Sequence, residues 1–378
     1  MRKTRNSLES QRKLTSLSGQ SRRFRCLAVN GQQKKWLTVL LATVSLFPLL
    51  SALGAAEAQA EKLKVVTTLP DLEWVVGFIG GDLVEVESLL SGAQDPHKIE
   101  PKPSLMAKLS DADLYVEIGL GLELWSGNLI EGARNANIQV GEKGHLYASD
   151  GITLLEKPAV ATRESGDMHP YGNPHIWLDP LNMLTVGDNV YGALVALDSA
   201  NTETYDANKK VYEAALYEAM FGPELVKLLG GDVLVRMERK GELLSFLEKK
   251  EYKGAPLLEK LGGWMGKAQP LVGKEVVFYH QSWIYFIDRF GLVASAYVEE
   301  KPGVAPSAAQ KERLVDLIHS KSIPVIAMTS YYDDSIPAKL AKETGATLVF
   351  IPNSIGGTKE ATDYFKTIDA IIDALVAH

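Results

Sequence analysis

The stretch KVVTTLPDLEWVVGFIGGDLVEVESLL, residues 64–90, carries the pattern that decides the fold. Lys64–Thr68 is a short run rich in β-branched residues, as is typical of a buried strand, and a Leu-Pro pair ends it. Leu72–Ile79 predicts a helix closed by a Gly-Gly pair, and Val84–Leu90 predicts a second strand. Strands that alternate with helices indicate a mainly parallel sheet flanked by helices.

The same alternation continues along the chain and predicts an α/β fold with two lobes. Leu114–Ile118 is a third strand, and a second set of strands and helices follows residue 270: strands Glu275–Tyr279, Leu292–Tyr297, Pro324–Thr329 and Thr347–Ile351, with helices at Ala308–His319 and Pro337–Thr344. Asp179 with Pro180 opens a helix as N-cap and first turn, and Thr202–Met220 is a long helix without Gly or Pro. We expect α/β lobes at 61–186 and 271–378, joined at 187–270 by a long connecting helix with a helical insertion.

The first sixty residues differ in composition from the rest. Residues 1–60 hold ten Lys and Arg against two Asp and Glu, which leaves 30 basic and 45 acidic residues for the remainder. A basic segment, an uncharged stretch from Trp36 to Ala56 and the small residues of Ala58-Gln59-Ala60 follow in the order of a secretory signal peptide. We expect 1–60 to be a cleaved signal peptide that sends the protein to the periplasm. The alternative is an uncleaved membrane anchor.

The single cysteine, Cys26, limits the chemistry of any metal site. It lies in the segment expected to be removed, so the mature chain Glu61–His378 has no thiol. A metal site must then use imidazole and oxygen ligands. The lack of a cysteine after the apolar stretch also argues against a lipid anchor. Asp and Glu outnumber Lys and Arg in the chain, which excludes a broadly basic nucleic-acid binder.

Three of the seven histidines share one kind of position. His97 lies in the loop after a strand, His175 precedes a helix in a Pro-bounded loop, and His280 ends a strand. Ligands of open α/β sheets collect outside the carboxyl ends of the strands. If two lobes face each other with such ends, the three imidazoles can meet around one ion. The alternative is that each is an ordinary hydrogen-bonded loop histidine.

Four segments of the chain form one series: Asp95-Pro96-His97-Lys98-Ile99-Glu100-Pro101, Asn173-Pro174-His175-Ile176-Trp177-Leu178-Asp179-Pro180, Tyr279-His280-Gln281-Ser282-Trp283 and Glu300-Lys301-Pro302-Gly303-Val304-Ala305-Pro306-Ser307. In this order, they resemble the corresponding segments of the periplasmic zinc/manganese solute-binding proteins of ABC metal importers (ZnuA/TroA-like). The resemblance implies two lobes joined by one long helix with the metal between them. His97 and His175 would come from the first lobe and His280 from the second.

The resemblance also bears on which metal is bound. Manganese binders of this family have a carboxylate in place of the third histidine, so His280 favours Zn²⁺, with Mn²⁺ as the alternative. The family's late carboxylate position falls at Asn353, and an amide is a poor ligand for zinc. We take Asp333 as the candidate fourth ligand, with Asp334 and water as rivals. The alternative for both aspartates is a solvated turn or a helix cap.

The resulting hypothesis is a monomeric periplasmic protein, not an enzyme, that captures a divalent metal ion and delivers it to an ABC permease. The acidic outer faces of the lobes would dock on the permease. A zinc hydrolase with three histidines and an open water position is the rival class, and Glu100 would then be the candidate general base. A manganese or iron transport protein and a surface adhesin are further alternatives.

Overall fold

The computed structural model describes residues 61–157, 171–300 and 303–378. The predicted signal peptide, Cys26 and the alternative membrane anchor lie outside these ranges, as does His169. Within the described ranges, no helix has the length and apolar character needed to span a bilayer. From Glu61 onward, the described residues belong to one unit of the chain, which contains both predicted lobes.

The first sheet has four parallel strands in the order β2-β1-β3-β4. The strands are β1 (Leu63–Thr67), β2 (Val84–Ser88), β3 (Leu114–Glu117) and β4 (His145–Tyr147), and the helices of this lobe are α1 (Pro70–Gly80), α2 (Pro103–Leu109) and α3 (Ser126–Ala133). The predicted βαβ unit at residues 64–90 is present as β1, α1 and β2. The sequence analysis had not predicted β4, α2 or α3.

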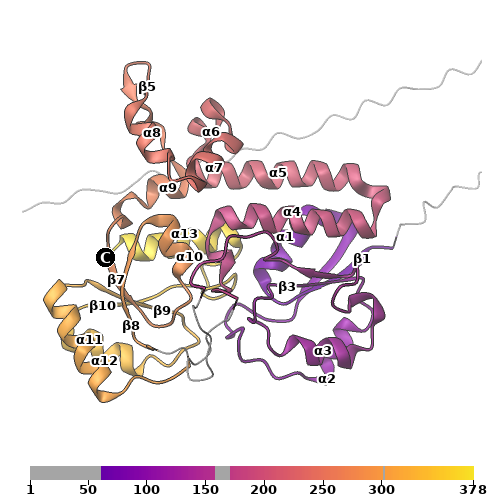
Figure 1. The fold of residues 1–378 in the computed structure, drawn as a ribbon, viewed down its shortest axis with the longest axis horizontal. Helices are drawn as coiled ribbons and strands as arrows, with labels where there is room; N and C mark the ends of the chain where they lie inside the picture. Colours follow the sequence, from indigo (N-terminus) through magenta and orange to yellow (C-terminus); the bar gives the residue numbers. More distant parts are fainter. Residues whose placement is uncertain (1–60, 158–170, 301–302) are drawn as a thin grey trace, which may run out of the picture. The chain divides into compact units, whose positions relative to one another are not determined.

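The second sheet is also parallel, with the order β10-β9-β7-β8 (Figure 1). Its strands are β7 (Glu275–Phe278), β8 (Val293–Tyr297), β9 (Val325–Met328) and β10 (Thr347–Phe350), and its helices are α10 (Ile284–Phe290), α11 (Ala308–Lys321), α12 (Ser335–Thr344) and α13 (Tyr364–Val376). Each predicted strand and helix of this lobe is present to within two residues. The predicted fold class is therefore confirmed.

Two long helices connect the sheets. α4 (Pro180–Leu197) begins at the predicted N-cap, where the Asp179 carboxylate accepts a hydrogen bond from the Leu181 N–H at 2.9 Å. α5 (Thr202–Phe221) packs against α4 and α1 and buries Tyr205, Tyr212 and Leu216, which share one face at helical spacing. Residue 186, where we expected the first lobe to end, lies inside α4.

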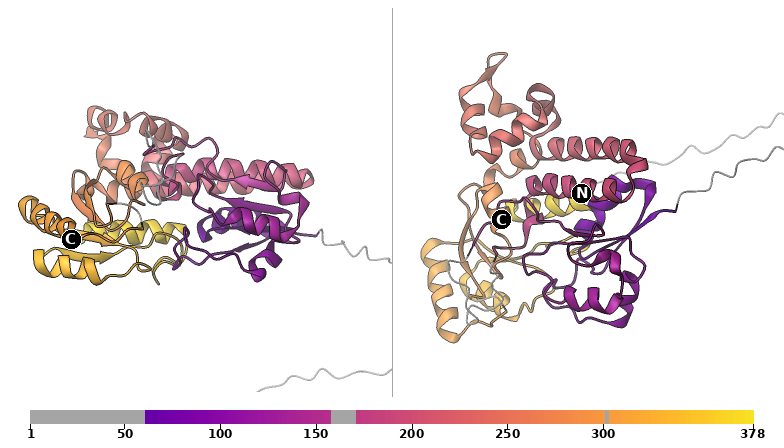
Figure 2. Two further views of the ribbon diagram at one scale, coloured as in Figure 1. Left: turned by 60° about the horizontal axis from the view of Figure 1, so that its bottom comes forward. Right: turned by 45° about the vertical axis from the view of Figure 1, so that its right-hand side comes forward.

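A small helical subdomain follows α5, within the range 187–270 where we expected a helical insertion. It contains α6 (Pro223–Leu229), α7 (Gly231–Arg239), α8 (Leu243–Lys249) and an antiparallel hairpin of β5 (Glu251–Tyr252) and β6 (Ala255–Pro256). The chain returns to the second lobe through α9 (Gly263–Lys267). In Figures 1 and 2, α6, α8 and β5 stand away from both sheets, whereas α7 lies close to the main body.

One continuous hydrophobic core joins the inner faces of both lobes. It runs from Val65 and Leu72 in the first lobe to Ile368 and Ile371 on α13. A separate cluster beneath α11 and α12 closes the outer face of the second sheet. Trp74 of α1 stacks on Tyr364 of α13 with ring centres 5.3 Å apart. Packed side chains of α1 and α13 therefore connect the two lobes.

Candidate metal centre

His97 lies in the loop between β2 and α2. Its backbone N–H donates to the Asp95 carboxylate at 3.1 Å, which forms a tight turn around Pro96. The Trp125 indole N–H donates to the Pro96 carbonyl at 2.8 Å and ties this loop to the start of α3. The imidazole is therefore presented by a short loop with two fixed points.

His175 is 1% exposed and opens the short 3₁₀ turn Ile176–Leu178. The Asn173 side-chain oxygen accepts from its backbone N–H at 3.0 Å and faces its Nδ1 at 2.8 Å. The Asn173 amide nitrogen donates to Glu156 and to the Gln281 carbonyl, so its oxygen must be the atom that faces the ring. An acceptor at Nδ1 places the proton there and leaves the lone pair on Nε2.

His280 is 5% exposed and follows β7. Its Nδ1 lies 3.0 Å from the Glu299 carboxylate, which also accepts from the Gly303 N–H at 3.1 Å. Burial acts to raise the pKa of Glu299, but the hydrogen bonds from His280 and Gly303 outweigh it, and the pKa is lowered. An ionised carboxylate holds the proton on Nδ1, so Nε2 of His280 again keeps its lone pair.

The three imidazoles gather at one place between the two sheets. The Nε2 atoms of His97 and His175 lie 3.3 Å apart, with ring centres 5.2 Å apart. Two nitrogen ligands bound tetrahedrally at about 2.0–2.1 Å lie roughly 3.3 Å apart. The pair of His97 and His175 therefore already has the spacing of two zinc ligands.

The third ring lies slightly farther out. The ring centre of His280 is 6.0 Å from that of His97 and 6.3 Å from that of His175. Imidazoles that share one zinc ion have ring centres roughly 5 Å apart. In the described ranges, no three His, Cys, Asp or Glu side chains are close enough together to form a complete ligand set. An approach of about 1 Å by His280 would complete a set of three nitrogens.

The predicted fourth ligand, Asp333, lies just before the start of α12. Asp333 is exposed, and its carboxylate accepts from the N–H and the hydroxyl of Ser335 at the start of α12. These bonds lower the pKa of Asp333, as expected for a capping carboxylate. Asp334 is the exposed N-cap residue of the same helix. Asp333 therefore has the contacts of a helix-capping carboxylate, whereas the Asp334 side chain makes no capping hydrogen bond.

Asn353 lies deeper than either aspartate. It is 2% exposed, and its side-chain amide donates to the Tyr331 hydroxyl at 3.1 Å. Its backbone carbonyl accepts from the Trp177 indole N–H at 2.6 Å. The Trp177 ring in turn lies 5.2 Å from the His175 ring. Asn353 therefore belongs to the packed surroundings of the histidines. Glu100, the base that a hydrolase would need, is exposed.

Sequence reasoning missed the residues that orient the histidines. Asn173 was quoted in a motif but given no role, although its place two residues before His175 was a signal. Glu299 lies 19 residues from its partner His280, and nothing in the sequence paired them. The ring of Tyr332, which lies 5.5 Å from that of His280, was also not foreseen.

A protein-family model described as the periplasmic component A of a zinc-uptake complex matches residues 65–220 and 258–378. The two matched segments leave out residues 221–257, which hold α6, α7, α8 and the hairpin.

Similar curated proteins carry several metals in their names. The iron-binding protein YfeA of Yersinia pestis is 27% identical over 89% of this chain and 94% of its own length. The manganese ABC transporter substrate-binding lipoprotein PsaA of Streptococcus pneumoniae is 34% identical over 48% of this chain. The iron ABC transporter substrate-binding lipoprotein MtsA of Streptococcus pyogenes is 32% identical over the same share. This chain spans 58% of the length of each streptococcal protein.

Solved structures support the fold. A crystal structure of ZnuA superposes with a TM-score of 0.61 and 24% identity, covering 84% of this chain and 99% of that one. The laminin-binding adhesin Lmb of Streptococcus agalactiae gives a TM-score of 0.61 at 20% identity, covering 83% and 98%. At these identities, the superpositions speak for the architecture alone.

Proposed function

The chain belongs to the family of periplasmic zinc-uptake components, and from this premise we propose that it captures one divalent metal ion, zinc before others, and hands it to an ABC permease. The family is one of substrate-binding proteins of ABC transporters rather than of enzymes. The proposal places the working protein in the periplasm as a monomer with one ion per chain.

One observation carries the proposal: two imidazoles of the first lobe and one of the second gather in a single place. His175 and His280 each have an acceptor at Nδ1, which leaves Nε2 for the ion. The 3.3 Å between the Nε2 atoms of His97 and His175 supports a shared metal. A site built from two lobes suits a carrier, because a change in the separation of the lobes releases the cargo.

The choice of zinc rests on the chemistry of the ligands. Neutral imidazole nitrogens suit Zn²⁺ in tetrahedral geometry, whereas Mn²⁺ prefers more oxygen ligands. Among the candidates for a fourth position, Asp333 and Asp334 are exposed at the start of α12. We therefore propose three histidine ligands and a water molecule in the fourth position. The iron and manganese in the names of YfeA, MtsA and PsaA make those two ions the competitors to test.

The test is a metal titration of the mature chain, residues 61–378, after treatment with a chelator. Calorimetry with Zn²⁺, Mn²⁺ and Fe²⁺ in separate runs should give one tight zinc site per chain and weaker binding of the other two. Zinc should also raise the melting temperature, because it binds the native state only. Tighter binding of Mn²⁺ or Fe²⁺ than of Zn²⁺ would overturn the proposed cargo.

Variants locate the site. Ala in place of His97, His175 or His280 should each weaken zinc binding by more than about 100-fold and remove most of the thermal shift. His319 is an exposed histidine on α11, so His319→Ala is the matched control and should bind like the wild type. Retention of tight binding by the triple variant would show that the site lies elsewhere.

A further inference from the structure

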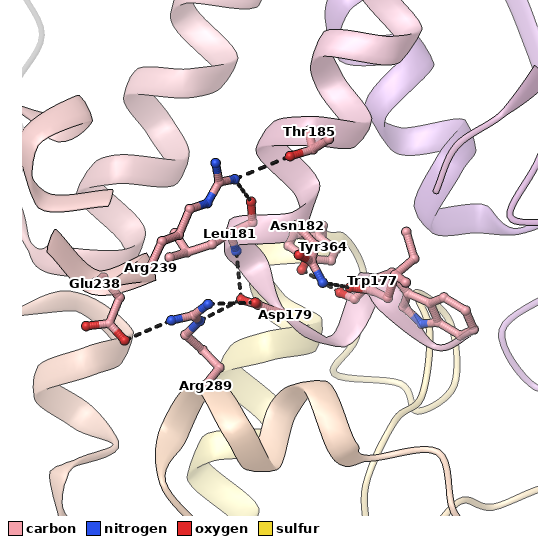
Figure 3. Close-up of polar contacts among 10 residues, drawn as sticks. Trp177, Asp179, Leu181, Asn182, Thr185, Glu238, Arg239, Arg289 and Tyr364 are labelled. Carbon is pink, nitrogen blue, oxygen red and sulfur yellow. Dashed lines mark hydrogen bonds and ion pairs between the residues drawn. The ribbon is translucent and has the colours of Figure 1, made fainter. Parts of the chain in front are cut away.

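A largely buried polar network links α7 of the helical subdomain to the start of α4 and to α10 (Figure 3). Arg289 of α10 donates from Nε and Nη2 to the two carboxylate oxygens of Asp179, each at 2.8 Å. Its Nη1 donates to the Glu238 carboxylate of α7, also at 2.8 Å. All three side chains are at most 12% exposed. The arginine therefore holds one carboxylate from α7 and one from the start of α4.

The next residue of α7 makes a second connection. The Arg239 Nη2 donates to the Leu181 carbonyl at 2.9 Å and contacts the Thr185 hydroxyl at 3.3 Å. Both acceptors lie in the first turns of α4, as Figure 3 shows. Neighbouring residues in the last turn of α7 thus bind α10 through Glu238 and α4 through Arg239.

The segments that meet in this network are the ones that present two of the histidines. Asp179 caps α4 and follows His175 by four residues, with only the 3₁₀ turn between them. α10 begins at Ile284, four residues after His280, and carries Arg289. The Asn173 amide and the Gln281 carbonyl link the same two segments directly at 2.7 Å. A displacement of α10 relative to α4 would therefore change the distance between the rings of His175 and His280.

The subdomain lies outside the family match, since residues 221–257 fall between the two segments that the family model matches. The pair of Asp179 and Arg289 lies within the matched segments, whereas Glu238 and Arg239 do not. A buried ion network is costly to disturb from one side, because the remaining charge stays desolvated. Glu238 thus makes the position of α10 relative to α4 depend on the subdomain.

We propose that Glu238 and Arg239 are positioning residues of the metal centre, through which the subdomain holds the segments of His175 and His280 together and slows the release of the ion. This inference rests on the proposed function for the identity of the cargo. The two residues do not touch the ion. They act through Arg289 and the first turns of α4.

The decisive measurement is the rate of zinc release from the mature chain, followed by stopped flow with an excess of a chromogenic chelator. Glu238→Gln keeps the shape of the side chain and removes its charge. We expect zinc to leave the variant about 5- to 10-fold faster, with an association rate within about 2-fold of the wild type. Glu248→Gln, at an exposed glutamate of α8, is the control and should release zinc at the wild-type rate.

A second variant covers the case in which Glu238→Gln does not fold. Arg239→Ala removes the contacts with α4 from an exposed residue, and it should also release zinc faster by about 3-fold or more. A lower melting temperature of the metal-free variants with unchanged release rates would overturn the inference, since the network would then be structural only. A wild-type chain that binds none of the three ions would instead overturn the proposed function, and the inference with it.

Discussion

Asn173 and Glu299 decide which nitrogen of His175 and of His280 is left for the proposed metal ion. Both present an oxygen to Nδ1, at 2.8 Å for His175 and 3.0 Å for His280. An imidazole whose Nδ1–H is held in this way keeps one tautomer and one ring orientation. Positioning of the ligands before the ion arrives lowers the entropy that binding must overcome.

Glu299→Gln tests this orientation at one atom. The amide can still accept from Nδ1–H, but it lacks the negative charge that makes the imidazole a stronger ligand, so we expect zinc affinity to fall by about 10-fold. Competition with a chelator of known affinity measures the change. Glu300→Gln alters an exposed neighbour paired with Arg313 and should leave the affinity unchanged. Equal losses in the two variants would contradict a role for Glu299 at His280.

The burial of the Asp71 carboxyl group makes the stability of the protein depend on pH. Its carboxylate accepts from the Ser354 hydroxyl, while Oδ1 is buried without a hydrogen-bond partner in the described residues. Burial raises the pKa of Asp71 to about 7, against the hydrogen bonds from Ser354 and the Ile355 backbone. A raised pKa means that the folded state holds the proton more tightly than the unfolded state does.

The sign of the pH dependence follows from this shift. The contribution of Asp71 to stability is fully present below its unfolded pKa of about 4, and it is lost as the pH rises to about 7. Asp71→Asn removes this loss, so the variant should gain on the order of 2–4 kcal/mol relative to the wild type between pH 4 and pH 8. Urea unfolding at several pH values measures the difference. A constant difference across that range would show that Asp71 does not titrate there.

The helices α12 and α13 both have an aspartate at the N-cap position, but only one of the two side chains makes the capping hydrogen bond. The Asp363 carboxylate accepts from the Lys366 N–H at 2.8 Å and caps α13, whose apolar face belongs to the core shared by both lobes. Asp334 stands at the same position of α12 but makes no such bond from its side chain. The two residues form a matched pair.

Asp363→Ala should therefore destabilise the protein by about 1 kcal/mol, because the N-terminus of α13 loses a hydrogen-bond acceptor. Asp334→Ala should cost less than half of that. Denaturant titration of the metal-free chain measures both variants. A larger loss for Asp334→Ala would mean that the assigned caps are wrong.

The elements that sequence reasoning missed share a physical reason. β4 is three residues long, too short to show a period, and it is a strand because β3 supplies its hydrogen bonds. The prediction of Asp333 as a ligand depends on tertiary contacts in the same way. An aspartate two residues before a helix can bind an ion or cap the helix, and only the position of Ser335 decides between them.

At the scale of the whole molecule, the two lobes touch through backbone as well as through side chains. Gly92, in the loop after β2, lies so close to the segment after β10 that a Cβ atom built on it would be 1.9 Å from the Ile355 carbonyl oxygen. No side chain can be accommodated there without a shift of one lobe relative to the other. This contact lies on the same segment as Ser354, the partner of Asp71.

Gly92→Ala should consequently lower the stability by about 1–3 kcal/mol and weaken zinc binding, because His280 belongs to the lobe that must move. Gly192→Ala is the control. Gly192 is exposed within α4, where an added Cβ meets nothing within 4 Å, and its replacement should stabilise the helix slightly. Thermal unfolding and calorimetry with zinc measure both effects. An unchanged affinity in Gly92→Ala would show that the lobes do not need this close contact.

Local patterns were enough to predict the alternation of strands and helices and the cap at Asp179, and to single out three histidines as candidates, because hydrophobic period, capping and loop placement are local properties. The tertiary structure alone decided which atoms orient the rings and which residues join the lobes. Glu299 reaches His280 across 19 residues, Arg289 reaches Asp179 across 110, and Glu238 reaches Arg289 from a segment outside the family match. Such partners depend on how helices and sheets pack, and no local pattern encodes the distance between two side chains that packing brings together.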